Sequence, residues 1–236
     1  MTSTLAYPLG SEFDPGRVRL GPGLTDETLS RLVGGGEGRR VLELGCGDGS
    51  NAIALAKQGA RVIVVDSSAA RLGVARNHAE EHDVRIEFHH GDLADLAFVR
   101  ADQIDVCLAV YSLAEVGDVS RVFRQVHRVL KPEAPLVCSF PHPAFAMFDP
   151  TAPDPLRVAH PYDQSGPRSW ELGNDTITDH PRTVGEIFTT LHRSSFVVDQ
   201  LLEPTAPERA PRSASFTDAA RFVPATLIVR ARKQGN

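Results

Sequence analysis

Residues 40–49, with the sequence RVLELGCGDG, decide the fold of this chain of 236 residues. The apolar run at 40–44 is typical of a buried parallel strand, and the three glycines that follow predict a sharp turn. Residues 50–59, SNAIALAKQG, place apolar side chains at helical spacing and finish on a glycine, which is typical of a helix and its C-cap. We therefore expect a strand, a glycine turn and a helix in direct succession.

The alternation of strand and helix continues along the chain. We expect further strands at 60–65, 85–89, 104–111 and 135–140, and helices at 67–82 and 119–130. After a break of about forty residues, a helix at 183–194 and strands at 196–202 and 225–232 follow. Helices between short buried strands predict an α/β, doubly wound, mostly parallel sheet. The last two strands are expected to add an antiparallel edge, which makes seven strands in all.

The prolines divide the chain into a regular and an irregular part. None lies between Gly23 and Lys131, whereas ten lie in residues 132–181. Proline ends helices and central strands because it lacks a backbone donor. The proline-free part can therefore be continuous helix and sheet, and we expect the segment that follows the fifth strand to be irregular.

Composition and charge exclude several classes of protein. Hydrophobic residues make up 42 % of the chain and charged residues 23 %, which is ordinary for a folded globular domain. A net charge of −5 without a basic cluster argues against nucleic acid as a partner. The chain has neither an apolar run long enough to span a membrane nor an opening that resembles a secretory signal. Its three cysteines favour a reducing cytoplasm over a disulfide framework.

The glycine turn also predicts a ligand. Gly45, Gly47 and Gly49 let a ligand approach the main chain closely, and the next helix offers free N–H groups to an anionic group. Asp66 ends the following strand, where a carboxylate can accept hydrogen bonds from ribose hydroxyls. The third glycine comes one residue earlier than in the dinucleotide-binding fingerprint, and Glu43 precedes the first glycine. A nucleoside that carries an amino acid fits this pattern better than a pyrophosphate does.

Five stretches resemble motifs of the class I S-adenosylmethionine-dependent methyltransferases of the small-molecule type. They are VLELGCGDG (41–49), VIVVDSS (62–68), HHGDLADL (89–96), LAVYSLAEV (108–116) and VFRQVHRVLKPEAPLVCSF (122–140). In the last stretch, L-K-P-E-A stands where the family usually has L-K-P-G-G. The resemblance implies a Rossmann-like methyltransferase fold and S-adenosylmethionine as the cofactor, with S-adenosylhomocysteine as its product. It says little about the acceptor.

The resemblance also implies roles for individual residues. The methionine part and the turn would be formed by Glu43, Gly45, Cys46, Gly47 and Gly49, with Cys46 as a packing residue. The ribose, the adenine and the sulfonium would be contacted in turn by Asp66 and Ser67, by Gly91, Asp92 and Leu93, and by Val110 and Tyr111. From the residues alone, two alternatives stay open. The glycine turn can occur without a ligand, and the Asp92 carboxylate can cap the next turn.

We expect a single domain with four parts. An N-terminal segment, 1–32, folds over the cofactor, and its Tyr7, Phe13 and Arg17 are candidate contacts. Residues 40–140 form the cofactor-binding core, and the proline-rich segment 141–183 forms a lid that shapes the acceptor pocket. Residues 184–236 supply a helix and the antiparallel edge strands.

The lid carries the candidate residues for acceptor chemistry. His142 is the closest of them in chain order to the fifth strand and is the candidate general base, because a histidine can take a proton from a hydroxyl at neutral pH. His160, Tyr162, Trp170 and His180 are the further lid candidates. Each histidine could equally have an ordinary loop role. The histidines are widely spaced and lack an accompanying set of acids, so we predict no metal site.

The leading hypothesis is a methyltransferase that acts on an oxygen or nitrogen atom of a small organic molecule. A quinone-type C-methyltransferase is the first alternative, although the polar, proline-rich lid fits a lipid-like substrate less well. A protein of another class, which binds a nucleoside or dinucleotide without catalysis, is the second. The sequence does not predict the oligomeric state.

Overall fold

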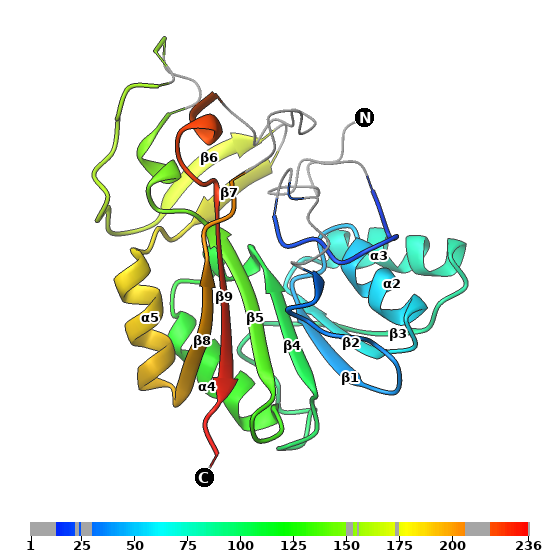
Figure 1. Ribbon diagram of the computed structural model, residues 1–236. Helices are drawn as coiled ribbons and strands as arrows, with labels where there is room; N and C mark the ends of the chain where they lie inside the picture. The colour runs from blue at the N-terminus through cyan, green and yellow to red at the C-terminus, as the bar shows by residue number, and fades with distance from the viewer. Residues whose placement is uncertain are drawn as a thin grey trace.

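The sheet that the sequence predicts is present in the structure, a computed structural model that describes residues 13–21, 24, 30–149, 153–154, 156–172, 175–205 and 218–235. The described residues form a seven-stranded sheet in the order β3-β2-β1-β4-β5-β9-β8 (Figure 1). Its strands are β1 (Arg40–Leu44), β2 (Arg61–Asp66), β3 (Ile86–His90), β4 (Val106–Val110), β5 (Pro135–Pro141), β8 (Phe196–Leu202) and β9 (Thr226–Lys233). Strands β1 to β5 run parallel, and β9 is antiparallel to both of its neighbours.

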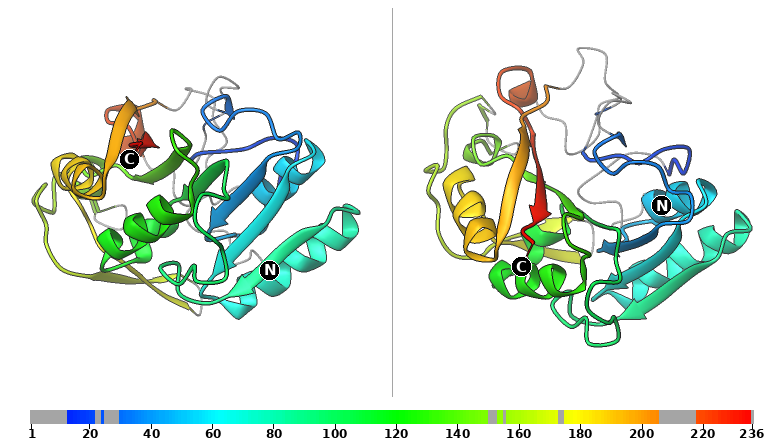
Figure 2. Two further views of the ribbon diagram at one scale, coloured as in Figure 1. Left: turned by 90° about the horizontal axis from the view of Figure 1, so that it is seen from below. Right: turned by 60° about the horizontal axis from the view of Figure 1, so that its bottom comes forward.

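In the described part of the chain, four helices cover the two faces of this sheet (Figure 2). They are α2 (Ser50–Lys57), α3 (Ala69–Glu81), α4 (Val119–Val129) and α5 (Val184–Arg193). Successive side chains of a strand point to opposite faces, so each buried strand contributes to two cores. Leu42 and Leu44 of β1 pack in the core under α4 and α5, whereas Val41 packs in the core under α2 and α3. The apolar stripe that predicted the fourth helix, which includes Val122 and Phe123, is fully buried in the first of these cores.

The chain order of the strands predicts a ligand site at the carboxyl ends of the parallel strands. The strand order reverses at β1, because β2 and β3 lie on one side of it and β4 and β5 lie on the other. Ligands of open α/β sheets bind outside the carboxyl ends of the strands at such a reversal. The β1–α2 turn, the end of β2 and a short 3-10 helix η2 (Ser112–Glu115) after β4 meet there. The described residues contain no helix that is long and apolar enough to cross a membrane.

The segment 141–183 is more regular than its prolines predict. After a short 3-10 helix η3 (Phe145–Met147), β6 (Arg168–Leu172) and β7 (Asp175–Asp179) form a two-stranded antiparallel sheet beyond the carboxyl end of β5 (Figure 1). The two strands fall in the proline-free interval between Pro167 and Pro181. A Gly-Asn pair at 173–174, between two runs of alternating residues, is a hairpin signal in the sequence. A last 3-10 helix, η4 (Asp218–Arg221), precedes β9.

Candidate functional site: a cofactor cradle and an adjoining pocket

The β1–α2 turn needs its glycines for two different physical reasons. Gly45 (φ +79°), Gly47 (φ +52°) and Gly49 (φ +87°) all have a left-handed backbone, which disfavours residues with a Cβ atom. A Cβ on Gly45 would lie 2.2 Å from Cβ of Ser112, whereas a Cβ on Gly47 would have no atom within 4 Å. Gly45 is therefore required by packing against η2, and Gly47 borders open space where a ligand could approach the main chain.

Gly49 and Cys46 complete the turn as packing positions. A Cβ on Gly49 would lie 3.1 Å from Cα of Ala75, so this glycine lets α2 and α3 approach each other. Cys46 is 5 % exposed, and its thiol lies 3.4 Å from Oδ2 of Asp66. Burial and the nearby Asp66 carboxylate raise the pKa of this thiol, so it stays protonated. Its location agrees with the packing role expected from the sequence.

Glu43 is a buried acid with an unused oxygen. The side chain sits on β1 and is 1 % exposed, and its Oε2 atom has no hydrogen-bond partner. Burial, together with the charges of Asp48 and Asp66, raises the pKa of Glu43 well above its usual range. A buried acceptor without a donor is costly in a protein interior. A cationic ligand group beside Glu43 would supply that missing partner.

Asp66 lies at the end of β2 with all four of its acceptor positions in use. Its Oδ2 accepts from the backbone N–H of Cys46 (2.8 Å) and is near the Cys46 thiol. Its Oδ1 accepts from the backbone N–H of Ser68 (2.8 Å) and from Nε of Arg71 (3.0 Å). The side chain is about 1 % exposed. Asp66 is where the sequence places the ribose-binding acid, although its carboxylate is covered.

Arg71 is a site residue that the sequence reasoning missed. It extends from α3 and joins Asp66 to Glu115 of η2, whose two oxygens accept from Nη1 (3.1 Å) and Nη2 (3.0 Å). Burial lowers the pKa of Arg71, but the hydrogen bonds and charges of Glu115 and Asp66 outweigh burial and raise it overall. Helical periodicity carries no signal for such a bridge, because Arg71 and Glu115 are 44 positions apart.

The predicted adenine side of the site lies at the carboxyl end of β3. Gly91 donates its N–H to the carbonyl of Asp66 (3.1 Å), and a Cβ on it would meet no atom within 4 Å. The Asp92 carboxylate accepts from the N–H of Ala94 (2.8 Å) and pairs with Arg121 (3.3 Å). The hydrogen bond from Ala94 is the turn cap that the sequence left open as the alternative to adenine binding. The adenine role stays a prediction.

Three other residues near the site differ in their exposure and contacts. Leu93 is buried in the core under α4 and α5. Ser67 is exposed, and its carbonyl oxygen lies 3.0 Å from Nε2 of His90. The neighbouring Ser68 is the residue that caps α3, because its hydroxyl accepts from the N–H of Arg71 (3.2 Å).

Val110 and Tyr111 lie where β4 leaves the sheet. Val110 ends the strand, and Tyr111 has φ +61°, a left-handed conformation that is rare for a bulky residue and ends the strand one residue earlier than predicted. The Tyr111 hydroxyl lies 2.6 Å from Oγ1 of Thr226 on β9. Burial raises the pKa of this hydroxyl. Ser112, the next residue, donates its hydroxyl to the carbonyl of Leu44 and ties η2 to the turn.

The described part of the N-terminal segment runs along α2. The backbone N–H of Asp14 donates to the hydroxyl of Ser50 (3.3 Å), and Asn51 exchanges hydrogen bonds with the main chain of Arg19. Ser50 and Asn51 are the first residues of α2, so this segment lies beside the glycine turn. The ring of Phe13 packs at 4.1 Å from that of His78 on α3.

The other two candidates of the N-terminal segment are Arg17 and Tyr7. Arg17 forms an ion pair with Asp14 (3.9 Å). Tyr7 lies outside the described residues.

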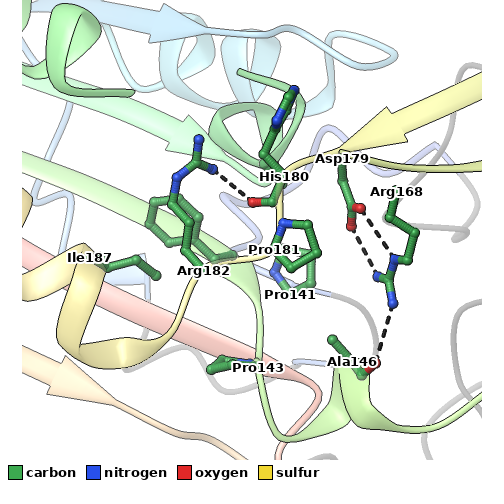
Figure 3. Close-up of a pocket in the computed structure, with 11 residues that line it drawn as sticks. Pro141, Pro143, Ala146, Arg168, Asp179, His180, Pro181, Arg182 and Ile187 are labelled. Carbon is green, nitrogen blue, oxygen red and sulfur yellow. Dashed lines mark hydrogen bonds and ion pairs between the residues drawn. The ribbon is translucent and has the colours of Figure 1, made fainter. Parts of the chain in front are cut away.

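A small pocket lies on the far side of η2, between the end of β5 and the segment 141–183 (Figure 3). Its lining is mostly apolar: Ala114, Phe140, Pro141, Pro143, Ala146, Pro181 and Ile187, joined by Arg168, Asp179, His180 and Arg182. Figure 3 shows Arg168 paired with Asp179, at 3.1 Å between Nη2 and Oδ2, with a further bond to the carbonyl of Ala146. The charged groups of this wall are thus already paired.

His142 lies in the chain between two lining residues, Pro141 and Pro143, and both of its ring nitrogens are in use. Its Nδ1 accepts from the N–H of Ala144 (3.1 Å), and its Nε2 lies 2.8 Å from Oε1 of Glu203. The ring is only 6 % exposed. Because Nδ1 is an acceptor, Nε2 is the nitrogen that carries the proton and donates to Glu203. In this arrangement, neither nitrogen has a free lone pair for a substrate.

The other lid candidates do not gather around His142. His180 donates its backbone N–H to the carbonyl of Ala114 (2.7 Å), which places it against η2. Tyr162 is 41 % exposed, and its hydroxyl accepts from the N–H of Val184 (3.4 Å). His160 is held by its backbone to Met147 (3.0 Å).

Trp170 belongs to β6, and the orientation of its side chain lies outside what the structure describes. The described residues include no cluster of three or more histidine, cysteine or acidic side chains that could hold a metal ion.

Comparison with known proteins finds similarity to methyltransferases. Residues 41–133 match the profile of a methyltransferase domain family. An S-adenosylmethionine-dependent methyltransferase from Mesorhizobium loti has a similar structure, with a TM-score of 0.73 and 28 % identity over 87 % of this chain and 95 % of that one. Residues 41–133 therefore match a methyltransferase domain, and the chain as a whole resembles S-adenosylmethionine-dependent methyltransferases. A methyltransferase of this type from Methanosarcina mazei shares the fold at 19 % identity, with a TM-score of 0.65 over 90 % of this chain and all of that one.

Sequence similarity to the curated relatives covers less than half of this chain. The ubiquinone biosynthesis O-methyltransferase of Hahella chejuensis is 36 % identical over 102 residues, which are 43 % of this chain and 43 % of the relative. The chain therefore spans less than half the length of the curated relatives it matches.

The residues of the methyltransferase domain fit the cofactor that the family implies. Oε2 of Glu43 is a buried acceptor that lacks a donor, which suits the ammonium group of an amino acid. Gly47 and Gly91 border space that a Cβ atom would enter, one at the end of β1 and one after β3. Asp66 lies between them at the end of β2, where the family places the ribose.

Proposed function

We propose that this protein transfers a methyl group from S-adenosylmethionine to an oxygen or nitrogen atom of a small organic molecule. The observation that carries the proposal is the pair of buried acids, Glu43 on β1 and Asp66 at the end of β2, together with the open position at Gly47 in the turn after β1. The unpaired oxygen of Glu43 would bind the ammonium group of the cofactor, and Asp66 would bind the ribose. Backbone N–H groups at the start of α2 would face the carboxylate.

The protein's part in this reaction is mainly positional. Bound S-adenosylmethionine supplies a methyl group that its sulfonium already activates, so the chain has to align the acceptor and exclude water. Good alignment contributes on the order of 7–11 kcal/mol to such a reaction. Ser112 contacts the β1–α2 turn and Ala114 lines the pocket of Figure 3, so only the short η2 separates the two. This closeness supports the pocket as the place of the acceptor.

The wall of the pocket supports an acceptor that is mostly apolar and carries one polar group. Its charged side chains are already satisfied, because Arg168 pairs with Asp179 and Arg182 donates to main-chain carbonyls. Within the described part of the chain, the ring of His180 has no hydrogen-bond partner. His180 is therefore better placed than His142 to accept a hydroxyl proton, and the base role of His142 stays a prediction.

Calorimetry tests the cofactor assignment. We expect S-adenosylhomocysteine to bind with a micromolar Kd and NAD to show no heat of binding. Binding of NAD alone would overturn the proposal in favour of a dinucleotide-binding protein. Transfer of a labelled methyl group to a panel of small phenols, catechols and amines then tests the reaction. Binding of S-adenosylhomocysteine without transfer to any acceptor would favour a sensor of the cofactor.

The same panel tests the alternative acceptor classes. The curated relatives are named for ubiquinone biosynthesis, but they align with less than half of this chain, so their acceptor does not carry over. Preferential methylation of a ring carbon in a prenylated quinol would favour the quinone-type C-methyltransferase instead. Nucleic acid is not among the acceptors that we propose, because the chain is acidic overall. The three buried free cysteines support a reducing cytoplasm as the place of action.

With an accepted substrate in hand, His180→Gln and His142→Gln separate the two histidines. If His180 takes the proton, His180→Gln lowers kcat and removes the acidic limb of the pH profile, whereas His142→Gln leaves that limb in place. The reverse pattern would assign the base to His142, as the sequence predicts. His160→Gln is the matched control, because its histidine lies in the same segment and does not line the pocket.

A further inference from the structure

Arg71 donates a hydrogen bond to Asp66, the carboxylate that a ribose would need. Its Nε atom donates to Oδ1 of Asp66 at 3.0 Å, and its two terminal nitrogens donate to both oxygens of Glu115. The guanidinium therefore spans from the β2 side of the β1–α2 turn to its β4 side. Ser112 ties η2, which carries Glu115, to the same turn. The three groups form a strap, Asp66–Arg71–Glu115, next to the place of the cofactor.

The hydrogen-bond count at Asp66 leaves no room for a ribose while this strap is in place. An ionised carboxylate offers about four acceptor positions. In Asp66 these are used by the N–H groups of Cys46 and Ser68, by the Cys46 thiol and by Arg71. A ribose diol brings two new hydroxyl donors. At least one present donor therefore has to leave when a nucleoside binds.

The donors differ in how easily they can leave. The N–H groups of Cys46 and Ser68 are fixed by the β1–α2 turn and by the start of α3. Breaking their hydrogen bonds to Asp66 would disrupt the local main-chain structure. The thiol is a weak donor that adds little. Arg71 is a side chain with several rotatable bonds, and 20 % of it is exposed to solvent. Glu115 can keep its charge paired after it leaves Asp66.

We propose that Arg71 is a cofactor-site residue that fills the ribose position of Asp66 in the free protein and gives it up to the incoming nucleoside. In the free protein Arg71 balances the charges of two acids that would otherwise repel each other. When the nucleoside binds, its hydroxyls take over the contact with Asp66, and Arg71 stays on Glu115. The cofactor therefore binds against an internal competitor. This inference rests on the proposed function, because it requires Asp66 to be the ribose-binding acid.

Calorimetric titration with S-adenosylhomocysteine tests the competition directly. Arg71→Met keeps most of the apolar stem and removes the guanidinium, and we expect it to bind S-adenosylhomocysteine about 3- to 10-fold tighter than the unchanged protein. That range corresponds to the loss of one partly exposed, charge-assisted hydrogen bond. Arg76→Met is the matched control on the same helix, because Arg76 lies over the ring of Phe88 and not beside Asp66. Its affinity should stay within twofold of the unchanged protein.

Two further measurements protect the test against a folding defect in Arg71→Met. Glu115→Gln weakens the contact that keeps Arg71 paired after it leaves Asp66, so we expect this variant to bind about twofold more weakly. In the unchanged protein, raising NaCl from 50 to 500 mM should tighten binding, because salt screens the strap. In Arg71→Met that salt effect should vanish.

The outcomes separate this inference from the proposed function. Unchanged or weaker binding in Arg71→Met, or unchanged or tighter binding in Glu115→Gln, would overturn the strap while leaving the cofactor assignment intact. A complete lack of binding in the unchanged protein and all variants would overturn the cofactor assignment and the strap with it. Binding by Arg71→Met alone would support the competition in its strongest form.

Discussion

The cofactor cradle, which consists of the ends of β1 and β2 and the β1–α2 turn, and the segment 141–183 hold their main chains in place by different means. The cradle relies on backbone geometry, with glycines at positive φ and acids that accept from N–H groups of the turn. The later segment relies on arginine side chains. Arg182 donates to the carbonyls of Leu113, Val116, Gly117 and His180, and so fastens the segment to the loop around η2.

This difference explains why one region can be predicted from its sequence and the other cannot. Backbone geometry leaves a local trace, because a glycine is required at the position that bends. An arginine clamp leaves none, because its partners are carbonyl groups, which every residue has. The arrangement also suggests a division of labour, in which the cradle is fixed by the fold and the segment 141–183 is attached to it by replaceable contacts.

The largest effect is expected at Gly45. Gly45→Ala adds a Cβ at 2.2 Å from Ser112 and imposes a left-handed backbone on alanine, and Gly47→Ala imposes only the second. We expect Gly45→Ala to lower the free energy of unfolding by about 3–5 kcal/mol, and Gly47→Ala by about 1–2 kcal/mol. Urea denaturation of both variants checks the difference. Equal losses would mean that η2 moves aside freely, and that the cradle is less fixed than the comparison requires.

The second effect is on the affinity of the cradle. Asp66→Ala removes the acceptor at the end of β2, and we expect the Kd for S-adenosylhomocysteine to rise at least 100-fold, about 3 kcal/mol. Asp92→Ala is the comparison variant, since that carboxylate is more than half exposed and already caps a turn. We expect its Kd to rise less than tenfold. An Asp66→Ala protein that binds as tightly as the unchanged one would refute the ribose role.

Arg182 offers the corresponding test in the other region. Arg182→Leu leaves several carbonyls around η2 without their donor, so we expect about 2 kcal/mol of lost stability. The Kd for S-adenosylhomocysteine should change less than threefold, while methyl transfer should fall at least tenfold. Arg182→Lys should restore part of the stability, because one ammonium can satisfy only some of these carbonyls. A large loss of cofactor affinity would show that the two regions are not independent.

The smallest effect is a pH-dependent change at Glu43. Its pKa is raised in the folded protein, so the folded state holds this proton more tightly than the unfolded one does. The stability that Glu43 contributes is complete below its ordinary pKa of about 4.5 and is lost as pH rises toward the raised value. Glu43→Gln removes this loss. We expect the variant to be about 1 kcal/mol more stable at pH 8 and equally stable at pH 4.

Binding should move in the opposite direction in the same variant. The amide that Glu43→Gln introduces lacks the charge that would attract an ammonium group, so we expect the Kd for S-adenosylhomocysteine to rise about tenfold. Thermal unfolding across pH and calorimetry at pH 8 check the two effects. A variant that is less stable at pH 8 would mean that Glu43 has a partner that this arrangement does not include.

Local sequence patterns were enough to predict most of the helices and strands of the fold. The strands at 40–44 and 196–202 have the predicted bounds, and the other predicted strands and helices of the sheet differ by one or two residues at their ends. The exception with a physical cause is the end of β4, where Tyr111 adopts a left-handed backbone that its side chain gives no reason to expect. The β6–β7 hairpin was missed because the prolines around it outweighed its own alternating pattern.

Contacts of the site can be predicted from the sequence only when the residues involved are close together in the chain. Glu43, Gly45 and Asp66 could be predicted as site residues, because each lies within one residue of the end of a strand that the sequence predicts. The bond between His142 and Glu203 joins positions 61 residues apart, and no local pattern indicates it. The Arg71–Glu115 bridge is of the same kind.

The position of β9 has a consequence for how the protein is made. β9 (residues 226–233) lies between β5 and β8 and pairs with the edge of β5 that faces away from β4. A ribosome completes β5, with its row of unpaired N–H and C=O groups, long before it makes the strand that covers it. An open edge of this kind is a template for wrong pairing with another chain. We expect the nascent protein to need a chaperone over this interval, and its yield to fall sharply when residues 226–233 are removed.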